Sequence, residues 1–465
     1  MDNKKSVNGK NKKQKNASPS RKLVLELLTE WEKEGGRFDL MLKGVLDKYD
    51  YLDKRDKAFI SVLSKGCVER RITLDYVIDR YSDTNGKAMK LPVRLILRMA
   101  VYQLLFMEGI KDHAACNEAV LLANEKGLKT LAPFVNGVLR SIERDKENIK
   151  WPDKKDDDKS LKIFYSVYYS MPIWIVGIFM KQFGPSDTEK ILKSFLSQGG
   201  VSLRINNLRD KDNVIKELES LGIKYSFSDY LPFMVTIDGF AGIGSLKCFN
   251  EGKVTVQDIS SALCSELAGI KEGDNVLDMC GAPGGKTTHA ALKTGKSGHV
   301  TSCDITEEKT YLINENISRM GITNTDVLVN DGTVFNPAFE EAFNVVICDA
   351  PCSGLGIMGR KPDIRYNMTY ETTEELANLQ KKILENAVRY VKKGGTLIFS
   401  TCTLNDKENM GGRDFILSKE GMAPDSFDNI PEQLKNEPGI SDGYICLKPG
   451  IHKCDGFFIS KYRKS

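Results

Sequence analysis

The sequence lacks the residue patterns that build cross-links and metal sites. It holds 11 cysteines, an odd number, with no Cys-x-x-Cys pair, and only four histidines. These features argue against a disulfide framework and against a metal site, and they favour the reducing cytoplasm as the compartment. The lysine-rich start is not followed by an apolar stretch, so no secretory signal is expected.

Long apolar runs and a strong net charge are also missing. The most apolar segment, 171–180, is shorter than the ~20 residues of a membrane span, so we expect a buried helix there and no membrane contact. The net charge is only +4, so any surface that binds nucleic acid must be local. The first residues are rich in lysine, and we expect a disordered basic tail over 1–18, solvated rather than tethered to phosphates.

The patterns along the chain predict three folded regions. Residues 19–147 carry apolar side chains at helical spacing without strand-like alternation, which predicts an all-helical domain. After a charged linker at 151–159, residues 161–240 mix helices with short strands and predict a small α+β domain of the ferredoxin-like or RRM-like type. From 241 to 465, strands alternate with helices, which predicts a doubly wound parallel sheet.

Individual strands can be assigned in the last two regions. In the small domain we expect strands at 201–205, 225–227 and 233–237. In the sheet that follows we expect parallel strands at 275–279, 299–303, 325–329, 344–348 and 396–400. A hairpin of residues 444–447 and 457–460 is expected at the edge of this sheet.

Two cysteines follow two of these strands. Cys352 lies in Asp-Ala-Pro-Cys-Ser-Gly (349–354), and Cys402 lies in Ser-Thr-Cys-Thr (400–403). Ligands of open α/β sheets bind at the carboxyl ends of the strands, so we expect both thiols in one catalytic pocket. A thiolate is a strong nucleophile, which indicates covalent catalysis. We expect four other cysteines to be small core residues: Cys264, Cys280, Cys303 and Cys348.

Residues 276–287 read as a strand, a glycine-rich turn and a helix start, which predicts a nucleotide-like ligand. A phosphate loop is one interpretation, although Cys280 stands where that motif needs its first glycine. The other interpretation is S-adenosylmethionine (SAM). Asp304 closes the next strand, where an acidic residue can bind ribose hydroxyls, and Asp331 follows the third strand and is placed to face the adenine. An uncharged, close-packed turn suits a nucleoside better than a triphosphate.

A SAM site together with two thiols narrows the set of possible reactions to methyl transfers that need a nucleophile. Carbon 5 of a pyrimidine is a poor nucleophile, but a thiolate that adds at carbon 6 makes it enamine-like, so that it can attack a methyl group. A base then removes the carbon-5 proton before the thiol leaves. An acid such as Asp349 near N3 and the exocyclic amine would favour cytosine. Physical reasoning alone leaves open which thiol attacks.

At these residues the chain resembles the RNA cytosine-C5 methyltransferases, and specifically the bacterial 16S rRNA methyltransferase B group. The matching motifs are 278–286, 349–354 with 362–364, 400–402 with 408–409, and 455–458. In the helical region, 113–120 and 134–140 resemble the NusB-like RNA-binding module of this group, so the resemblance covers about 20–465. Two departures are Gly281, where alanine is usual, and Met410, where an acid is common.

The resemblance implies a NusB-like domain and a Rossmann-like SAM-dependent methyltransferase domain. It implies that Cys402 is the nucleophile and that Cys352 assists breakdown of the adduct. The implied cofactor contacts are Cys280, Gly281, Ala282, Pro283, Gly284, Gly285, Lys286, Asp304, Asp331 and Asp349. The implied substrate is a cytosine of 16S rRNA, of the cytosine-967 type, methylated by a cytoplasmic monomer.

The target cytosine must be single-stranded or flipped out, because a duplex hides carbon 6. Arg360, Lys361 and Arg365, just beyond Cys352, are placed to meet phosphates, and a solvated loop is the alternative interpretation. Three alternatives stay open: the same chemistry on tRNA or another RNA, an RNA-binding assembly or antitermination factor with an idle catalytic half, and a P-loop NTPase. The intact thiols argue against the second alternative, and Cys280 argues against the third.

Overall fold

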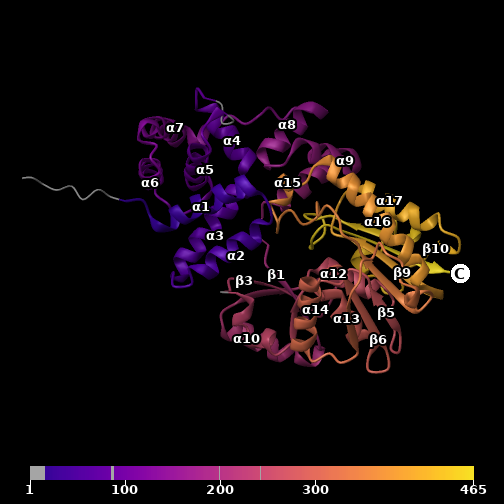
Figure 1. The fold of residues 1–465 in the computed structure, drawn as a ribbon. Coiled ribbons are helices and arrows are strands. Elements are labelled where there is room, and N and C mark those ends of the chain that lie inside the picture. Colours follow the sequence, from indigo (N-terminus) through magenta and orange to yellow (C-terminus); the bar gives the residue numbers. More distant parts are fainter. Residues whose placement is uncertain (1–15, 85–87, 198, 241) are drawn as a thin grey trace, which may run out of the picture. The chain divides into compact units, whose positions relative to one another are not determined.

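The computed structural model describes residues 16–465, except 85–87, 198 and 241 (Figure 1). The chain forms two compact units, one that ends at Ile173 and one that begins at Trp174. Most of the basic tail expected over 1–18 lies outside the described residues. At its end, the backbone N–H groups of Ala17 and Ser18 donate to carboxylates on a later helix, at 2.7 and 2.8 Å.

The first unit is built from helices, as the spacing of its apolar residues predicts. Helix α5 lies at its centre and contacts α1, α3, α4, α6 and α7, because apolar residues cover most of its circumference. The helices are α1 (Pro19–Glu34), α2 (Phe38–Lys48), α3 (Lys54–Glu69), α4 (Arg71–Arg80), α5 (Leu91–Phe106), α6 (Asp112–Glu125), α7 (Ala132–Asp145) and α8 (Asp158–Tyr168). No helix in the described part of the chain is long and apolar enough to cross a membrane.

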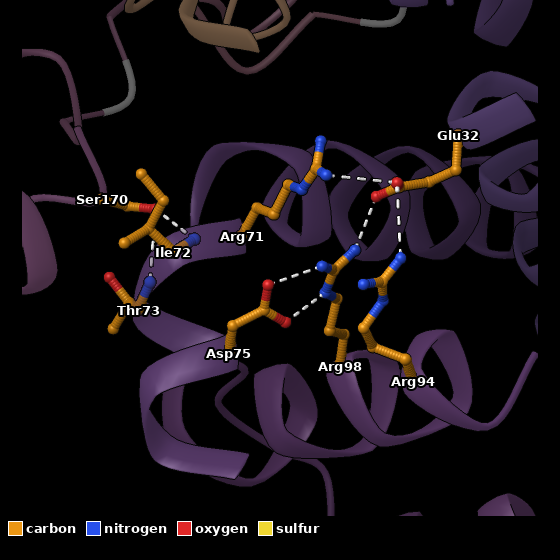
Figure 2. A network of polar contacts seen from close by, with 8 residues as sticks. All are labelled: Glu32, Arg71, Ile72, Thr73, Asp75, Arg94, Arg98 and Ser170. Carbon is orange, nitrogen blue, oxygen red and sulfur yellow. Dashed lines mark hydrogen bonds and ion pairs between the residues drawn. The ribbon is translucent and has the colours of Figure 1, made fainter. Parts of the chain in front are cut away.

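A network of arginines and carboxylates joins α1, α4 and α5 (Figure 2). The guanidinium of Arg98 forms two 2.6 Å hydrogen bonds to Asp75 and a third to Glu32. Arg71 and Arg94 approach the same Glu32 carboxylate at 3.3 and 3.9 Å. Burial opposes the charge of Arg98, but Asp75 and Glu32 outweigh it and raise the pKa of this side chain. Two carboxylates therefore neutralise most of the charge that these helices bury.

The second unit begins with α9 (Ile173–Ser194) and a small antiparallel sheet. Gly184, with φ +72°, breaks α9 just before Pro185, so the two helical patterns of this region form two segments. The small sheet has the order β2-β3-β1-β4, and its fourth strand lies beyond residue 240. Its elements are β1 (Val201–Ile205), α10 (Lys211–Ser220), β2 (Lys224–Phe227), β3 (Met234–Asp238), α11 (Lys247–Asn250) and β4 (Val254–Val256).

The large sheet has the order β10-β12-β9-β8-β5-β6-β7, with β11 also paired to β12. The five predicted parallel strands are confirmed and are joined by antiparallel strands beside β9. The strands are β5 (Asn275–Asp278), β6 (His299–Asp304), β7 (Thr325–Val329), β8 (Phe343–Asp349), β9 (Val391–Thr401), β10 (Met422–Pro424), β11 (Tyr444–Leu447) and β12 (Phe457–Lys464).

The expected hairpin of β11 and β12 forms, with β11 as its outer strand. Its second strand, β12, lies in the interior of the sheet and is longer than predicted. It extends to Lys464, so its first half pairs with β11, its second half pairs with β10, and its other side pairs with β9 along six residues. The predicted span of 457–460 was too short to show this.

Helices cover both faces of the large sheet. Val276 and Val345 pack with residues of α12 (Ile259–Leu267) and α13 (Gly285–Thr294). Their neighbours Leu277 and Val346 face the opposite way, against α16 (Tyr370–Tyr390) and α17 (Asp406–Leu417). Figure 1 shows α16 and α17 on one side of the sheet and α12 and α13 on the other. Side chains that alternate along a strand point to opposite faces, so both faces are buried. The remaining helices are α14 (Glu307–Met320), which contacts β6 and β7, and the short α15 (Ile364–Asn367).

Candidate active site

The structure brings the two predicted cysteines together. Strands β8 and β9 are parallel neighbours with Asp349 beside Ser400, so the chain leaves the sheet at the same edge in both cases. The sulfur atoms of Cys352 and Cys402 are 3.3 Å apart, and both side chains are partly buried. The neighbouring sulfur of Cys402 and then burial raise the pKa of Cys352 well above its ordinary value. Cys352 is therefore held as a neutral thiol beside its partner.

A third side chain, Glu408, joins the two cysteine loops, and the sequence reasoning assigned it no role. Its carboxylate is fully buried in the first turn of α17. It accepts hydrogen bonds from the backbone N–H of Ser353 at 2.9 Å, from Asn405 at 3.2 Å and from Thr403 at 3.4 Å. Gln380 on α16 donates a further bond at 3.1 Å. Burial raises the pKa of Glu408, and these donors oppose that shift.

Because Ser353 directly follows Cys352 and Thr403 directly follows Cys402, this carboxylate fixes the spacing of the two thiols. The sequence does contain a signal for it. Asn405 is the N-cap of α17, and a glutamate three residues after an N-cap is the pattern of a capping box. In the sequence, that pattern indicates only the start of a helix. The hydrogen bond from Glu408 to the loop of Cys352 becomes visible only in the fold.

Asp349, the predicted cytosine contact, is held by neighbours on two elements. Its Oδ2 accepts a 2.6 Å hydrogen bond from Lys286, and its Oδ1 accepts one from Ser400 at 2.8 Å. Lys286 also donates to Ser261 at 2.9 Å. Burial opposes the charge of Lys286, but Asp349 outweighs it and raises the pKa of the lysine. The last residue of the predicted cofactor turn thus touches the predicted catalytic aspartate.

The glycine-rich turn connects β5 to α13, as predicted. Gly284 is the N-cap of α13 with φ +104°, a conformation that favours glycine. At the base of the turn, the buried Asp278 accepts from Thr287 at 2.7 Å, and burial raises its pKa to about 6. Its other oxygen has no hydrogen-bond partner among the described residues. A tight turn with an orphaned buried acceptor fits the amino group and ribose of a nucleoside cofactor such as SAM.

The two predicted ribose and adenine contacts follow neighbouring parallel strands. Asp304, at the end of β6, accepts from the backbone N–H of Ala282 at 3.0 Å and pairs with Lys309 at 3.0 Å. Asp331, after β7, accepts from the backbone and the hydroxyl of Thr333. The residues assigned to SAM therefore follow the four neighbouring strands β8, β5, β6 and β7, with Asp349 at the end of β8, and ligands of such sheets bind at these strand ends.

The predicted phosphate contacts are only partly at the surface. Arg365 is 1% exposed, so the expectation that it meets phosphates is wrong. It donates to the carbonyls of Phe195 and Met358 because the loop beyond Cys352 folds back over it. Arg360 is more exposed but donates to two carboxylates, Asp455 at 2.5 Å and Asp258 at 2.9 Å. Within the described residues, no group of three His, Cys, Asp or Glu side chains is placed to hold a metal.

Comparisons with known proteins match this architecture. The family model "16S rRNA methyltransferase RsmB/F" matches residues 267–463, and the model "NusB family" matches residues 18–144. The "Probable ribosomal RNA small subunit methyltransferase B" of Bacillus subtilis (strain 168) is 34% identical over 96% of this chain and 98% of its own length. The "Ribosomal RNA small subunit methyltransferase B" of Escherichia coli O1:K1 / APEC is 30% identical over 88% and 91%.

Solved structures agree at the level of the fold. The crystal structure of PH0851 superposes with a TM-score of 0.78 at 25% identity and covers 97% of this chain and 100% of its own. NSun6 from Pyrococcus horikoshii with SFG gives a TM-score of 0.57 at 23% identity over 63% of this chain and 98% of its own. The second likeness concerns the fold alone.

Proposed function

This chain belongs to the 16S rRNA methyltransferase RsmB/F family and is a SAM-dependent methyltransferase, and from that premise we propose that it methylates carbon 5 of a cytosine through a covalent thiol adduct. One observation carries the proposal: two thiols 3.3 Å apart at the edge of the sheet that also holds the cofactor turn. Methylation of an exocyclic amine needs no thiol, so this pair favours carbon 5.

The order of events follows from the chemistry of cytosine. The Cys402 thiolate adds to carbon 6, and the electron pair released along the ring makes carbon 5 nucleophilic. SAM supplies an electrophilic methyl group, which carbon 5 takes with loss of the sulfonium charge. A base then takes the carbon-5 proton, and the electron pair of that C–H bond restores the double bond as Cys402 leaves as a thiolate. We assign Cys352 to this release step because its sulfur lies 3.3 Å from that of the departing Cys402.

Asp349 orients the base in this scheme. Its carboxyl group is held from both sides by Lys286 and Ser400, so its position is fixed before cytosine enters. A carboxyl oxygen that accepts the exocyclic amine distinguishes cytosine from uracil, which has a carbonyl at that place. We assign the cofactor to the turn from Cys280 to Lys286, with Asp304 on the ribose and Asp331 on the adenine side.

We propose small-subunit rRNA as the substrate, with a target of the cytosine-967 type. The curated relatives are named for small-subunit rRNA, and the NusB-family match supports the assignment of the helical unit to RNA binding. The small sheet is a second candidate for RNA contact. Methylation of tRNA by the same chemistry is the competing proposal, and the test below separates the two.

The test uses the full chain, labelled SAM and 16S rRNA from cells that lack this modification. We expect label at carbon 5 of one cytosine, found by nuclease mapping and nucleoside analysis. Fully modified 16S rRNA and unmodified tRNA serve as matched substrates that should take no label. Label on an amine nitrogen contradicts the carbon-5 chemistry, and label on tRNA alone contradicts the rRNA assignment.

A further inference from the structure

A buried arginine connects the small sheet to the cofactor turn. Arg204 lies on β1 and is 1% exposed. Its Nη1 donates to the carbonyl of Gly285 at 2.9 Å and to Gln257 at 2.7 Å. Its Nη2 donates to the hydroxyl of Thr288 at 3.0 Å, and its Nε donates to Asn206 at 3.0 Å. The guanidinium thus holds two residues of the first turn of α13, where the cofactor turn ends.

The burial of Arg204 costs the folded state free energy. All of its hydrogen-bond acceptors are neutral, and burial lowers the pKa of this side chain. A cation buried without a hydrogen-bonded carboxylate carries a desolvation cost. Its place at the N-terminus of a helix, where the macrodipole is positive, adds to that cost. Stability of the fold therefore does not explain why an arginine stands here.

A chain of hydrogen bonds runs from Arg204 to Asp349, at the strand ends that carry the two thiols (the catalytic edge). Gln257, which accepts from Arg204, donates to the hydroxyl of Ser261 at 3.4 Å. Lys286 donates to the same hydroxyl at 2.9 Å and to Asp349 at 2.6 Å. The side chain of Gln257 also lies 3.6 Å from where a Cβ at Gly285 would be. The position of Lys286, and through it that of Asp349, is thus linked to the small sheet.

A second connection holds the other side of the turn. Arg319 on α14 donates to the carbonyl of Phe249 at 2.7 Å and to that of Val254 at 2.9 Å, both in the small-sheet region. It also donates to Asn316 at 2.8 Å, and the amide of Asn316 donates to the carbonyl of Pro283 at 2.8 Å. Pro283 lies in the middle of the cofactor turn. The turn is therefore held at its middle and at its end by groups anchored to the small sheet.

We propose that the small sheet is a structural part of the cofactor site and that Arg204 is its positioning residue. Arg204 sets the conformation of the turn that receives SAM, and through Gln257 and Lys286 it sets the place of Asp349. The statement about Asp349 rests on the proposed function. The statement about SAM needs only the cofactor turn, and it is tested without RNA.

The test measures the dissociation constant of SAM for the full chain by titration calorimetry. Arg204→Met should weaken SAM binding by about tenfold, because a turn left without its anchor must be ordered when the ligand binds. Arg204→Lys keeps the charge but loses the planar fork, so it should recover only part of the affinity. Asn316→Ala removes the bond to Pro283 together with those to Leu312 and from Arg319, all of them near the protein surface, and should weaken SAM binding about threefold.

Asn324→Ala is the matched control. Asn324 donates to Ala291, Thr294 and Gly295 at the far end of the same helix α13, so its loss affects stability without touching the turn. We expect its SAM affinity to stay within about twofold of that of the unsubstituted chain. An unchanged affinity in a folded Arg204→Met or Asn316→Ala protein would overturn the proposal. An equal loss in Asn324→Ala would overturn it as well, because the effect would then be general destabilisation.

The outcomes also separate this proposal from the proposed function. SAM binding without RNA does not depend on which atom receives the methyl group. If Asn316→Ala weakens SAM binding while the product map shows label on an amine, the positioning role stands and the carbon-5 chemistry fails. If the map shows label at carbon 5 while SAM affinity does not change in the variants, the carbon-5 chemistry stands and the positioning role of Arg204 fails.

Discussion

Two buried arginines, one in each unit, are held in opposite ways. Arg98 in the helical unit is surrounded by the carboxylates of Asp75 and Glu32, which raise its pKa. Arg204 in the second unit is surrounded by carbonyl, amide and hydroxyl oxygens, and its pKa is lowered. The first arrangement neutralises charge and joins helices. The second leaves a buried charge without a hydrogen-bonded carboxylate next to the proposed cofactor turn, and perturbed ionisable groups tend to gather at functional sites.

The same contrast extends to the catalytic edge. Cys352 has a raised pKa, and Asp278 has an oxygen with no partner among the described residues. Substitutions in the helical network should therefore change stability, whereas substitutions at the catalytic edge should change chemistry or ligand affinity. The following predictions test that division.

Removal of either thiol should have the largest effect of all these substitutions. It should change methylation and adduct formation and leave stability unchanged. Cys402→Ala should lower methylation at least about 10³-fold and abolish the RNA–protein adduct on denaturing gels, because the nucleophile is lost. Cys352→Ala should instead accumulate a stable adduct, because release stalls. Thermal stability of both variants should stay close to that of the unsubstituted chain. Adduct formation by the Cys402→Ala protein would reverse the two assignments.

Removal of the Arg98 side chain should give the largest loss of stability. Arg98→Met leaves Glu32, 7% exposed, and Asp75 without their main cation, and we expect a loss of about 3 kcal/mol in the free energy of unfolding. Urea unfolding followed by circular dichroism measures it. SAM affinity should stay unchanged, in contrast to Arg204→Met. If Arg98→Met weakened SAM binding as much as Arg204→Met, the division between the two regions would not hold.

Glu408→Gln should lower kcat by about 10- to 100-fold with little change in KM for SAM. The added amide group donates where the carboxylate accepted, so it conflicts with the N–H of Ser353 and shifts the loop that carries Cys352. Glu374→Gln, on the same pair of packed helices but paired with the exposed Lys407, is the matched control and should retain activity. A fall in KM and kcat alike in both variants would mean that Glu408 only stabilises the fold.

The sequence alone predicted most of the fold and the loops that carry the candidate site, for identifiable reasons. The strands β5, β8 and β9 are largely buried, so they appear as apolar runs, and the glycine-rich turn, Cys352 and Cys402 each follow one of them. The fourth strand of the small sheet has three residues and was missed. The partners of Glu408 and Arg204 are distant in sequence, and neither pattern nor spacing encodes such contacts. Arg365 looked like a surface cation because its burial depends on the loop that folds over it.

Gly281 shows how one such contact can require a glycine in the cofactor turn. A Cβ at this position would collide with the hydroxyl of Ser302 and lie 2.9 Å from that of Thr287. These hydroxyls are 2.8 Å apart, and Thr287 donates to the buried Asp278. Gly281→Ala should therefore cost about 1–2 kcal/mol of stability, since overpacking displaces this pair.

Alanine at position 281 then becomes a test of the contact. Ser302→Ala removes the colliding hydroxyl, so the double variant Gly281→Ala/Ser302→Ala should regain part of the stability that Gly281→Ala loses. Thermal unfolding of the four proteins in a double-mutant cycle measures the coupling. Additive effects would mean that the two positions do not interact, and that Ser302 is not the reason for glycine at 281. A positive coupling would show that the turn tolerates either a Cβ at position 281 or a hydroxyl at position 302, but not both.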